Sequence, residues 1–238
     1  MNQFTSFART PLQMRRAARA VRTDGEATRA RILEAAGELF AASGFAETTN
    51  KAVAAKAGVD LASINYHFGS RSGLYQAVLA EAHRRVMDLA DLQRLALTPL
   101  PASERLRMLI DQLVRRATSD ADGWHLTVLA GEILTPSSHI QVLFQSEVSL
   151  KIPVVTGILS EITGIPVDAP AMLLCLLNVA APCLLLVIGR RGIPGPPQAI
   201  LKTPHDRIVE HLHRFAIAGL QAIGRDYADA VTQRGVGL

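Results

Sequence analysis

The fold of the N-terminal part of the chain is decided by residues 48–68, which read TTNKAVAAKAGVDLASINYHF. Thr48 and Thr49 are natural N-cap residues, because a threonine hydroxyl can accept a hydrogen bond from an N–H group that the first helical turn leaves free. In the segment that follows, Val53 and Ala57 are four positions apart and fall on one face of a helix. The pattern predicts a short helix that buries this face.

A second short helix is predicted over residues 61–67. Gly58 precedes it and supplies a left-handed turn residue, and Asp60 can cap its first turn. Ile64 and Phe68 are one turn apart and point inward, which leaves the other side chains of this helix outside. The two short helices are therefore joined by a tight turn that contains glycine.

A longer helix precedes both of them and begins at about Glu26. Its apolar residues recur with helical spacing, and Ser43-Gly44 ends it. These apolar residues are Ile32, Leu33, Ala36, Leu39 and Phe40. Two short helices propped by a longer one are the sequence form of the helix-turn-helix, whose last helix enters the major groove of DNA.

The positive charge of the chain is concentrated at its N-terminal end. Residues 1–75 hold ten Lys and Arg against six Asp and Glu, whereas residues 76–238 hold fifteen of each kind. This imbalance favours a polyanionic partner for the N-terminal part, although a solvated basic tail would give the same count. Residues 1–24 show no periodicity and carry five arginines, so we expect a disordered basic arm there rather than an organellar transit peptide.

Over about residues 26–80 the chain resembles the TetR family of repressors. The matching motifs are Thr28-Arg29-Ala30-Arg31-Ile32-Leu33-Glu34-Ala35-Ala36, Gly44-Phe45, Thr48-Thr49, Val53-Ala54, Ala57-Gly58-Val59 and Asn65-Tyr66-His67-Phe68-Gly69-Ser70. The resemblance implies a homodimeric repressor whose C-terminal domain binds an inducer and thereby changes the spacing of two DNA-reading heads.

The resemblance also implies which residues contact DNA. Positions similar to phosphate contacts of the family are Thr49, Asn50, Lys51, Asn65 and His67, and Arg71 is a further DNA-binding position. Positions similar to its base contacts, or close to the same groove, are Leu61, Ala62, Ser63 and Tyr66. The apolar pair Leu61-Ala62 favours contact with thymine methyl groups as much as hydrogen-bonded readout. Arg71 replaces the lysine that is usual in the family, and Asn65 replaces a tyrosine, so the operator sequence stays open.

The rest of the chain predicts a larger helical domain, which makes the protein all-α. Apolar periodicity predicts helices over residues 70–95, 103–118, 124–134, 138–163, 169–189 and 206–225. Pro153 and Gly157 predict a kink in one of them. We divide the chain into the arm, a helix-turn-helix domain over 25–70, an effector-binding and dimerisation domain over 71–228, and a frayed tail over 229–238.

Aromatic and polar side chains within these helices are candidates for a small-molecule pocket. They are Trp124, His125, Glu132, Phe144 and Asn178. Packing in the core or a place on the surface is the alternative interpretation of each residue.

Residues 169–189 form the most apolar run of the chain, and it is long enough to span a bilayer. A membrane anchor is therefore a competing interpretation. Pro182, Asn178 and several alanines favour a tightly packed soluble helix instead. The resemblance implies that this helix and the one over 206–225 pair with their copies in a second subunit, so we expect no membrane partner.

The sequence carries none of the common catalytic motifs, so we expect no catalytic residue and no cofactor. His205, His211 and His213 are spaced so that neighbours two apart on a helix point in nearly opposite directions and cannot share a metal ion. Cys175 and Cys183 are too far apart on one helix to form a disulfide, which favours a cytoplasmic protein. We expect a regulator of double-stranded operator DNA with a small-molecule effector; a membrane-anchored protein, an enzyme and a scaffold are the alternatives.

Overall fold

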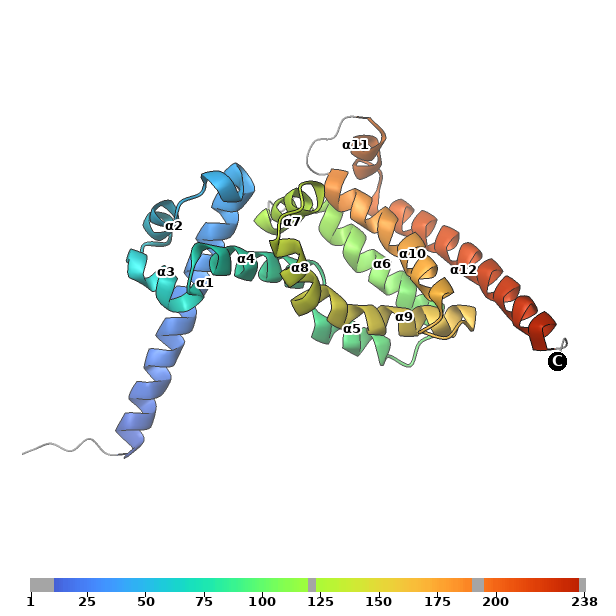
Figure 1. The fold of residues 1–238 in the computed structure, drawn as a ribbon, viewed down its shortest axis with the longest axis horizontal. Helices are drawn as coiled ribbons and strands as arrows, with labels where there is room; N and C mark the ends of the chain where they lie inside the picture. Colours follow the sequence, from blue (N-terminus) through green and yellow to red (C-terminus); the bar gives the residue numbers. More distant parts are fainter. Residues whose placement is uncertain (1–10, 120–122, 190–194, 236–238) are drawn as a thin grey trace, which may run out of the picture. The chain divides into compact units, whose positions relative to one another are not determined.

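The computed structural model of the chain describes residues 11–119, 123–189 and 195–235, and all regular structure within these ranges is helical (Figure 1). The prediction of an all-α fold is therefore confirmed. The chain divides into two compact units, Met1–Tyr75 and Gln76–Leu238, and each is described by itself.

α1 (Pro11–Glu47) is the long helix of the first unit, and it is interrupted at Gly44, where φ is 77°. This break agrees with the predicted helix end, because a positive φ suits glycine and stops a regular helix. The start of α1 differs from the prediction, since residues 11–24 of the expected disordered arm are helical. Alanine and arginine dominate this segment, and both have high helix propensity. Residues 1–10 of the expected arm lie outside the described residues.

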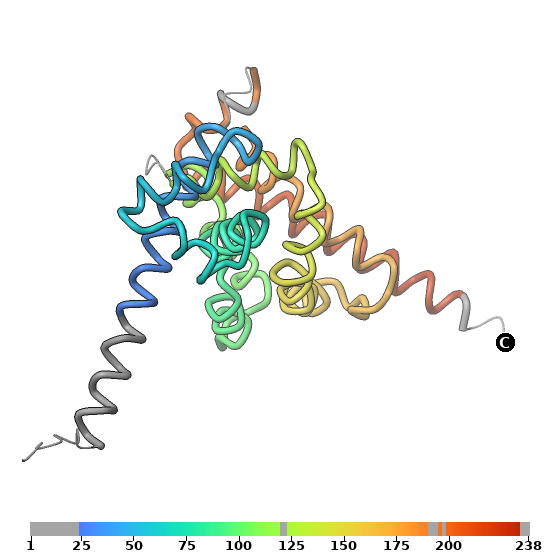
Figure 2. The backbone as a smooth tube through the Cα atoms, turned by 60° about the vertical axis from the view of Figure 1, so that its left-hand side comes forward, coloured from blue at the N-terminus to red at the C-terminus, as the bar shows by residue number. Residues whose placement is uncertain are grey.

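The two predicted short helices are α2 (Asn50–Ala57) and α3 (Leu61–Phe68). They follow the bend at the end of α1, and α2 packs on α1 and on α3 (Figure 2). Apolar side chains that are fully buried form the centre of this unit, namely Ile32, Ala36, Val53 and Ile64.

α4 (Arg71–Val86) begins in the first unit and continues into the second. The prediction of a single helix over residues 70–95 is wrong, because Asp88 starts a separate helix, α5 (Leu89–Ala96). Its carboxylate accepts hydrogen bonds from the N–H groups of Ala90 at 2.9 Å and Asp91 at 3.1 Å. The apolar spacing continues across this break, so periodicity alone did not reveal it.

Other helices of the second unit lie close to the predicted positions. They are α6 (Ala102–Thr118), α7 (Trp124–Leu134), α8 (His139–Leu143), α9 (Ser149–Thr163), α10 (Pro170–Gly189) and α12 (His205–Gly235). Two features were not predicted. α11 (Pro196–Leu201) lies in a segment without periodicity, and α12 continues through residues 229–235, which were expected to fray.

α8 and α9 are joined by a π-helical turn, η1 (Phe144–Val148). The N–H of Ser149 donates to the carbonyl of Phe144, five residues back. This irregularity, which was not predicted, lies before Pro153, and α9 continues through Pro153 and Gly157. A π-helical turn adds one residue to a helix and is frequent at functional sites.

The core of the second unit lies among α6, α9, α10 and α12, which pack on one another (Figure 1). Its fully or almost fully buried side chains include Leu106, Ile110, Ile158, Leu159, Ile165 and Met172. Large apolar side chains of α10 that point away from this core remain exposed.

Two helical stretches, His139–Thr163 and Pro170–Gly189, are long and apolar enough to cross a membrane if only length and composition are considered. In the most apolar 18-residue window of each stretch, 33% of the residues are buried inside the unit. Apolar helices in the core of a globular domain meet the same criteria, so these stretches do not by themselves separate the two interpretations of residues 169–189.

Candidate functional site

The start of α2 is held by the predicted threonine pair, with one role for each residue. Thr49 is the N-cap, and its hydroxyl accepts a hydrogen bond from the N–H of Ala52 at 3.1 Å. Thr48 is buried, and its hydroxyl donates to the carbonyl of Gly44 at 2.8 Å. α2 is thereby fixed to the end of α1, and Thr49, Lys51 and Ala52 at its start are exposed.

The turn between α2 and α3 depends on Gly58, which has φ 63° and ψ 45°. In this left-handed conformation its N–H donates to the carbonyl of Ala55 at 3.3 Å, and the N–H of Val59 donates to that of Ala54 at 3.1 Å. Asp60 lies at the N-cap of α3, but its side chain accepts no capping hydrogen bond. The predicted cap is thus present by position and contributes only its backbone.

α3 buries one side and exposes the other. Ile64 is fully buried, whereas Tyr66 is 85% exposed and Leu61 is 50% exposed. Ala62 and Asn65 are exposed as well, and Ser63 and His67 are half-buried. The Tyr66 and His67 rings meet edge to face at 4.9 Å. The structure therefore brings the predicted base-contacting side chains together on one free helix face.

Two lysines of α2 differ in their surroundings. Lys51 is exposed in the first turn, next to Thr49 and Asn50. Lys56 lies in the last turn and forms an ion pair with Glu38 of α1 at 2.6 Å. Lys51 is therefore available for a phosphate group, whereas Lys56 helps to hold α2 on α1.

Arg71, one of the predicted DNA-binding residues, makes several contacts within its own unit. Its guanidinium donates to the carbonyl of Phe45 and to that of Ala46, the latter at 2.8 Å. The same group stacks over the Phe45 ring at 4.4 Å from the centroid. Arg71 thereby joins the end of α1 to the start of α4.

A cavity of about 220 Å³, partly open to solvent, lies in the second unit between α4, α6, α9 and α10. Most of its wall is apolar, and Leu109, Val155 and Leu176 are representative of the lining. Cys183 also lines it, and burial raises the pKa of this thiol to about 11, so the thiol stays protonated at neutral pH. Two polar side chains reach the wall, His83 of α4 and Lys151 of α9.

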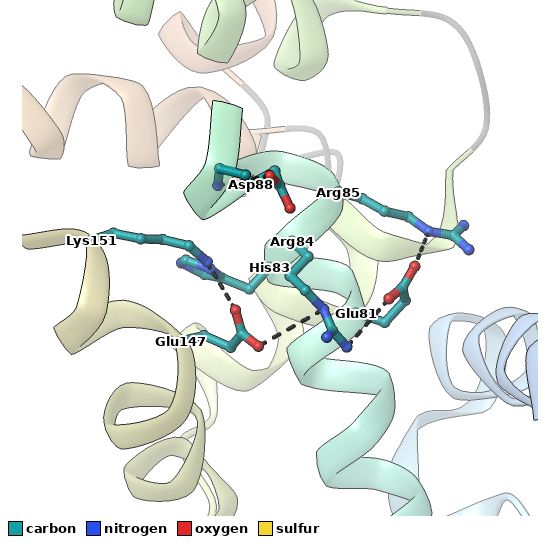
Figure 3. Close-up of polar contacts among 8 residues, drawn as sticks. Glu81, His83, Arg84, Arg85, Asp88, Glu147 and Lys151 are labelled. Atoms are coloured by element: carbon teal, nitrogen blue, oxygen red, sulfur yellow. Dashed lines mark hydrogen bonds and ion pairs between the residues drawn. The ribbon is translucent and has the colours of Figure 1, made fainter. Parts of the chain in front are cut away.

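The buried ammonium group of Lys151 is the main polar feature of this cavity. The residue is only 3% exposed, and its Nζ donates to Glu147 Oε2 at 3.0 Å and to His83 Nδ1 at 2.8 Å (Figure 3). Glu147 belongs to the π-helical turn η1, one helical turn before the lysine. A buried ammonium group is tolerated only when charged or polar partners replace its water.

Further charges connect this pair to α4. Arg84 Nε lies 3.8 Å from the other oxygen of Glu147, and Arg84 and Arg85 both pair with Glu81, at 3.3 and 3.1 Å (Figure 3). The guanidinium of Arg85 also lies 4.8 Å from the ring centroid of Trp124. The wall of the cavity is therefore linked to α4 through η1.

His83 titrates well below its usual range. Burial, and then the charge of Lys151, lower its pKa from 6.5 to about 4. At neutral pH the imidazole is therefore uncharged, and its Nδ1 can accept the hydrogen bond from Lys151.

The low pKa of His83 predicts that the protein loses stability in mild acid. Between pH 6.5 and about 4 the unfolded chain binds a proton at this histidine and the folded chain does not. We expect this group to contribute about 2 kcal/mol more to the free energy of unfolding at pH 7 than at pH 5. Urea denaturation of the wild type and of His83→Gln at both pH values measures it. If both proteins lose the same free energy of unfolding between pH 7 and pH 5, His83 is not the group responsible for the loss.

The five predicted pocket residues do not line this cavity. Trp124 is buried beneath Arg85, and His125 follows it in the first turn of α7. Glu132 is buried and accepts hydrogen bonds from the N–H and hydroxyl of Ser137, at 3.0 and 2.7 Å. Phe144 is 50% exposed and Asn178 is exposed on α10. The predicted residues are of types that suit a pocket, but their side chains lie outside this cavity because of the orientation of each helix.

Sequence reasoning missed Lys151, Glu147 and His83. A usable signal was present, because Lys151 is the one charged residue between Ser149 and Ser160 in an otherwise apolar and small-residue segment. Glu147 precedes it by four positions, a spacing that allows an ion pair on a helix.

Metal and thiol chemistry find no support in the parts of the chain that the structure describes. No group of three or more His, Cys, Asp or Glu side chains is placed to hold a metal ion there. Cys175 and Cys183 are both buried and free. His205 contacts Asp111 at 2.6 Å, and His213 contacts the carbonyl of Ser103 at 3.0 Å, so these two histidines join α12 to α6.

Two family models match the chain. The model described as bacterial regulatory proteins of the tetR family matches residues 32–78, which contain the helix-turn-helix. The model described as the C-terminal domain of the HTH-type transcriptional dual regulator CecR matches residues 102–220, which is half of the chain.

Curated relatives match about a quarter of the chain. The HTH-type transcriptional regulator SrpR of Pseudomonas putida is 41% identical over 63 residues, and the uncharacterized regulator TtgW of the same species is 40% identical over 63 residues. Each match covers 26% of this chain, with 30% of SrpR and 47% of TtgW. The chain thus matches less than half the length of these relatives.

Solved structures share the fold over most of the chain. FadR of Bacillus subtilis has a TM-score of 0.64 at 15% identity, and covers 79% of this chain and 97% of its own. A TetR-like regulator from Rhodococcus sp. RHA1 has a TM-score of 0.60 at 19% identity, with 81% and 95% covered. Together with the two family matches, this places the chain in the TetR family of bacterial transcriptional regulators, with an N-terminal DNA-binding domain and a C-terminal domain of the CecR type.

Proposed function

We propose that this regulator is a cytoplasmic repressor that binds a palindromic operator as a homodimer and leaves it when a small molecule occupies its C-terminal domain. The observation that carries the proposal is the free face of α3, where Tyr66 and Leu61 are exposed although their types usually pack. Regulators of this family are not enzymes, in agreement with the lack of catalytic motifs in the sequence.

The first test is selection of bound fragments from random duplex DNA. We expect an inverted repeat, because a two-fold dimer presents two copies of α3 to the duplex. The affinity of the protein for this DNA should fall steeply as the salt concentration rises, because each phosphate that a side chain neutralises releases counterions. Failure to enrich any sequence at low salt would contradict the proposed DNA contact.

The lysines of α2 provide a matched pair of variants for the DNA surface. We expect Lys51→Ala to weaken operator binding about tenfold and to lower the slope of log affinity against log salt by about one per half-site. Lys56→Ala, in the same helix but paired with Glu38, should change the slope little. Fluorescence anisotropy at several salt concentrations measures both variants.

Tyr66→Ala tests the base-reading face in the same assay. We expect a loss of operator affinity that is larger than the loss on random DNA, since side chains on this face of α3 read base edges. Operator affinity unchanged in both Lys51→Ala and Tyr66→Ala would argue against the assigned face.

The proposed dimer rests on the apolar side of α10 that no part of the described chain covers. Its exposed leucines are Leu173, Leu174, Leu177, Leu184 and Leu185. The neighbouring helix α12 exposes Phe215, which is 75% accessible. Exposed apolar side chains on neighbouring helices are typical of a protein interface, and we assign these to contact with a second copy of α10 and α12 rather than with lipid.

A charged residue in this surface should separate the subunits. We expect Leu177→Glu to be a monomer in sedimentation, and to bind the operator at least tenfold more weakly because two half-sites are no longer held by one particle. Leu97→Glu is the control, since Leu97 is 84% exposed at the end of α5. A dimeric Leu177→Glu, or a Leu97→Glu that dissociates equally, would contradict the assignment.

The proposed effector site is the cavity among α4, α6, α9 and α10. Solved relatives with this fold include a FadR of Bacillus subtilis in complex with stearoyl-CoA, so at least one such protein holds a small molecule. For this chain, loss of operator binding in the presence of members of a compound panel is the test.

A further inference from the structure

We infer that the cavity selects small apolar molecules that carry one negative charge, and that Lys151 is the residue that binds this charge. The inference rests on the proposed function of the second unit as a sensor, but it concerns the chemical class of the effector. It is argued from the shape and charge of the cavity wall.

The size and lining of the cavity limit the apolar part of the ligand. An engineered apolar cavity of about 150 Å³ binds benzene, so a cavity of about 220 Å³ has room for a somewhat larger molecule, of about ten non-hydrogen atoms. Leucine, isoleucine and valine side chains from three helices form most of the wall. Such a wall favours an aliphatic chain or a single aromatic ring over a polar molecule.

The charge on the wall determines the polar end of the ligand. Lys151 has three N–H donors, and Glu147 and His83 account for two of them. His83 is uncharged at neutral pH because its pKa is about 4, so Lys151 is the charged side chain of the cavity lining. A carboxylate that enters the cavity therefore meets a buried, positively charged donor.

The surrounding network has more positive than negative groups. Lys151, Arg84 and Arg85 are opposed by Glu147 and Glu81 (Figure 3). Asp88, which is also drawn there, uses its carboxylate to cap α5. Arg84 Nε is buried without a hydrogen-bond partner among the described residues, and at 3.8 Å the nearest Glu147 oxygen is beyond hydrogen-bond reach. Arg84 Nε thus lacks an acceptor, which the Glu147 carboxylate would supply if an anion displaced it from Lys151.

The same contacts connect the ligand to α4. Glu147 is shared between Lys151 of α9 and Arg84 of α4. An anion on Lys151 competes with Glu147 for the ammonium group and releases this carboxylate toward Arg84. Because Glu147 lies in a π-helical turn, a small change in the register of η1 can accompany its movement. The ligand therefore alters the link between η1 and α4, the helix whose first residues belong to the DNA-binding unit.

Three probes of nearly equal shape test the inference by calorimetry on the full chain without DNA. They are octanoate, octan-1-ol and octylammonium. We expect octanoate to bind about tenfold or more tightly than octan-1-ol, and octylammonium to bind most weakly, because only the carboxylate pairs with a charged donor.

Two variants assign the selectivity to named side chains. Lys151→Met keeps the length and apolar stem of the side chain, and should abolish the preference for octanoate over octan-1-ol. Glu147→Gln removes the competing carboxylate, and should strengthen octanoate binding while octan-1-ol is unaffected. Lys202→Met, an exposed lysine after α11, should leave all three affinities unchanged. If Lys151→Met does not fold, the selectivity of the wild type and the gain in Glu147→Gln still decide the question.

The inference is overturned if octan-1-ol binds as tightly as octanoate, if octylammonium binds best, or if none of the probes binds at about 1 mM. These outcomes differ from a failure of the proposed function. If the protein binds octanoate through Lys151 but selects no DNA sequence, the proposed repressor function is refuted and the inferred ligand class stands. A protein that binds an operator but releases it only with cationic or neutral compounds would refute the ligand class alone.

Discussion

Replacing Gly224 with alanine is expected to destabilise the second unit by about 2 to 3 kcal/mol, although alanine is the better helix former. Gly224 lies in α12, where a Cβ atom would be 2.3 Å from the carbonyl oxygen of Thr163 and 3.0 Å from its carbonyl carbon. Contacts this short with backbone atoms force the two helices apart. The shift should appear as a lower urea midpoint with an unchanged slope.

Thr163 cannot easily move away from the added methyl group. Its hydroxyl donates to the carbonyl of Leu159 at 2.9 Å and accepts from the N–H of Ile165 at 3.1 Å. Gly164, the next residue, ends α9 with φ 72°. Thr163 is therefore held in place by its side chain. The strain caused by the added methyl group then falls on the packing of α12 against α9.

Gly157→Ala is the matched control, because it lies inside α9 and its Cβ would meet no atom within 4 Å. There the helix propensity of alanine should act alone and stabilise the unit by up to about 1 kcal/mol. The two substitutions are chemically identical, so opposite signs would separate the close helix contact from propensity. A Gly224→Ala protein as stable as the wild type would contradict the close approach.

The helix-turn-helix could be predicted from sequence because local signals determine it. Thr49 caps α2, Gly58 takes the left-handed turn conformation, and Ile64 is buried in α3, all within twenty residues. Each interaction joins residues close in the chain. Arg71 is the exception, because its partners at Phe45 and Ala46 are about 25 positions away, and nothing in the local pattern distinguishes a phosphate contact from this one.

The cavity could not be predicted in the same way because it depends on four helices that meet from distant parts of the chain. Trp124, Glu132 and Phe144 were predicted as pocket residues because of their types, yet the wall of the cavity consists mostly of common apolar side chains. An isolated lysine in an apolar helix, Lys151, was the informative feature, and its type alone gave no information on burial.

The second large effect is expected at Arg105, which is buried in α6. Its Nε donates to the carbonyl of Leu100 at 3.1 Å and its Nη1 to that of Ala96 at 2.7 Å, and its remaining nitrogen pairs with Glu161 of α9. Arg105→Met removes all three interactions while it keeps an apolar side chain of similar length. We expect a loss of about 2 to 4 kcal/mol in the free energy of unfolding, measured by urea denaturation.

Arg107→Met, an exposed arginine two positions later in α6, should change stability by no more than about 0.5 kcal/mol. If Arg105→Met is as stable as the wild type, the carbonyl groups of Ala96 and Leu100 find other hydrogen-bond donors.

The ion pair and the carbonyl hydrogen bonds of Arg105 can be separated. Glu161 is 55% exposed, so Glu161→Gln should cost less than about 1 kcal/mol, and salt should reduce that cost by screening. The carbonyls of Ala96 and Leu100 lie at the end of α5 and in the loop that follows, where Arg105 replaces the partners that a continuing helix would have provided. If these hydrogen bonds dominate, the loss of unfolding free energy in Arg105→Met persists at high salt. Arg105→Lys should then not restore the stability of the wild type, because lysine lacks the planar fork of donors. A loss that disappears in high salt would instead assign the stability to the ion pair.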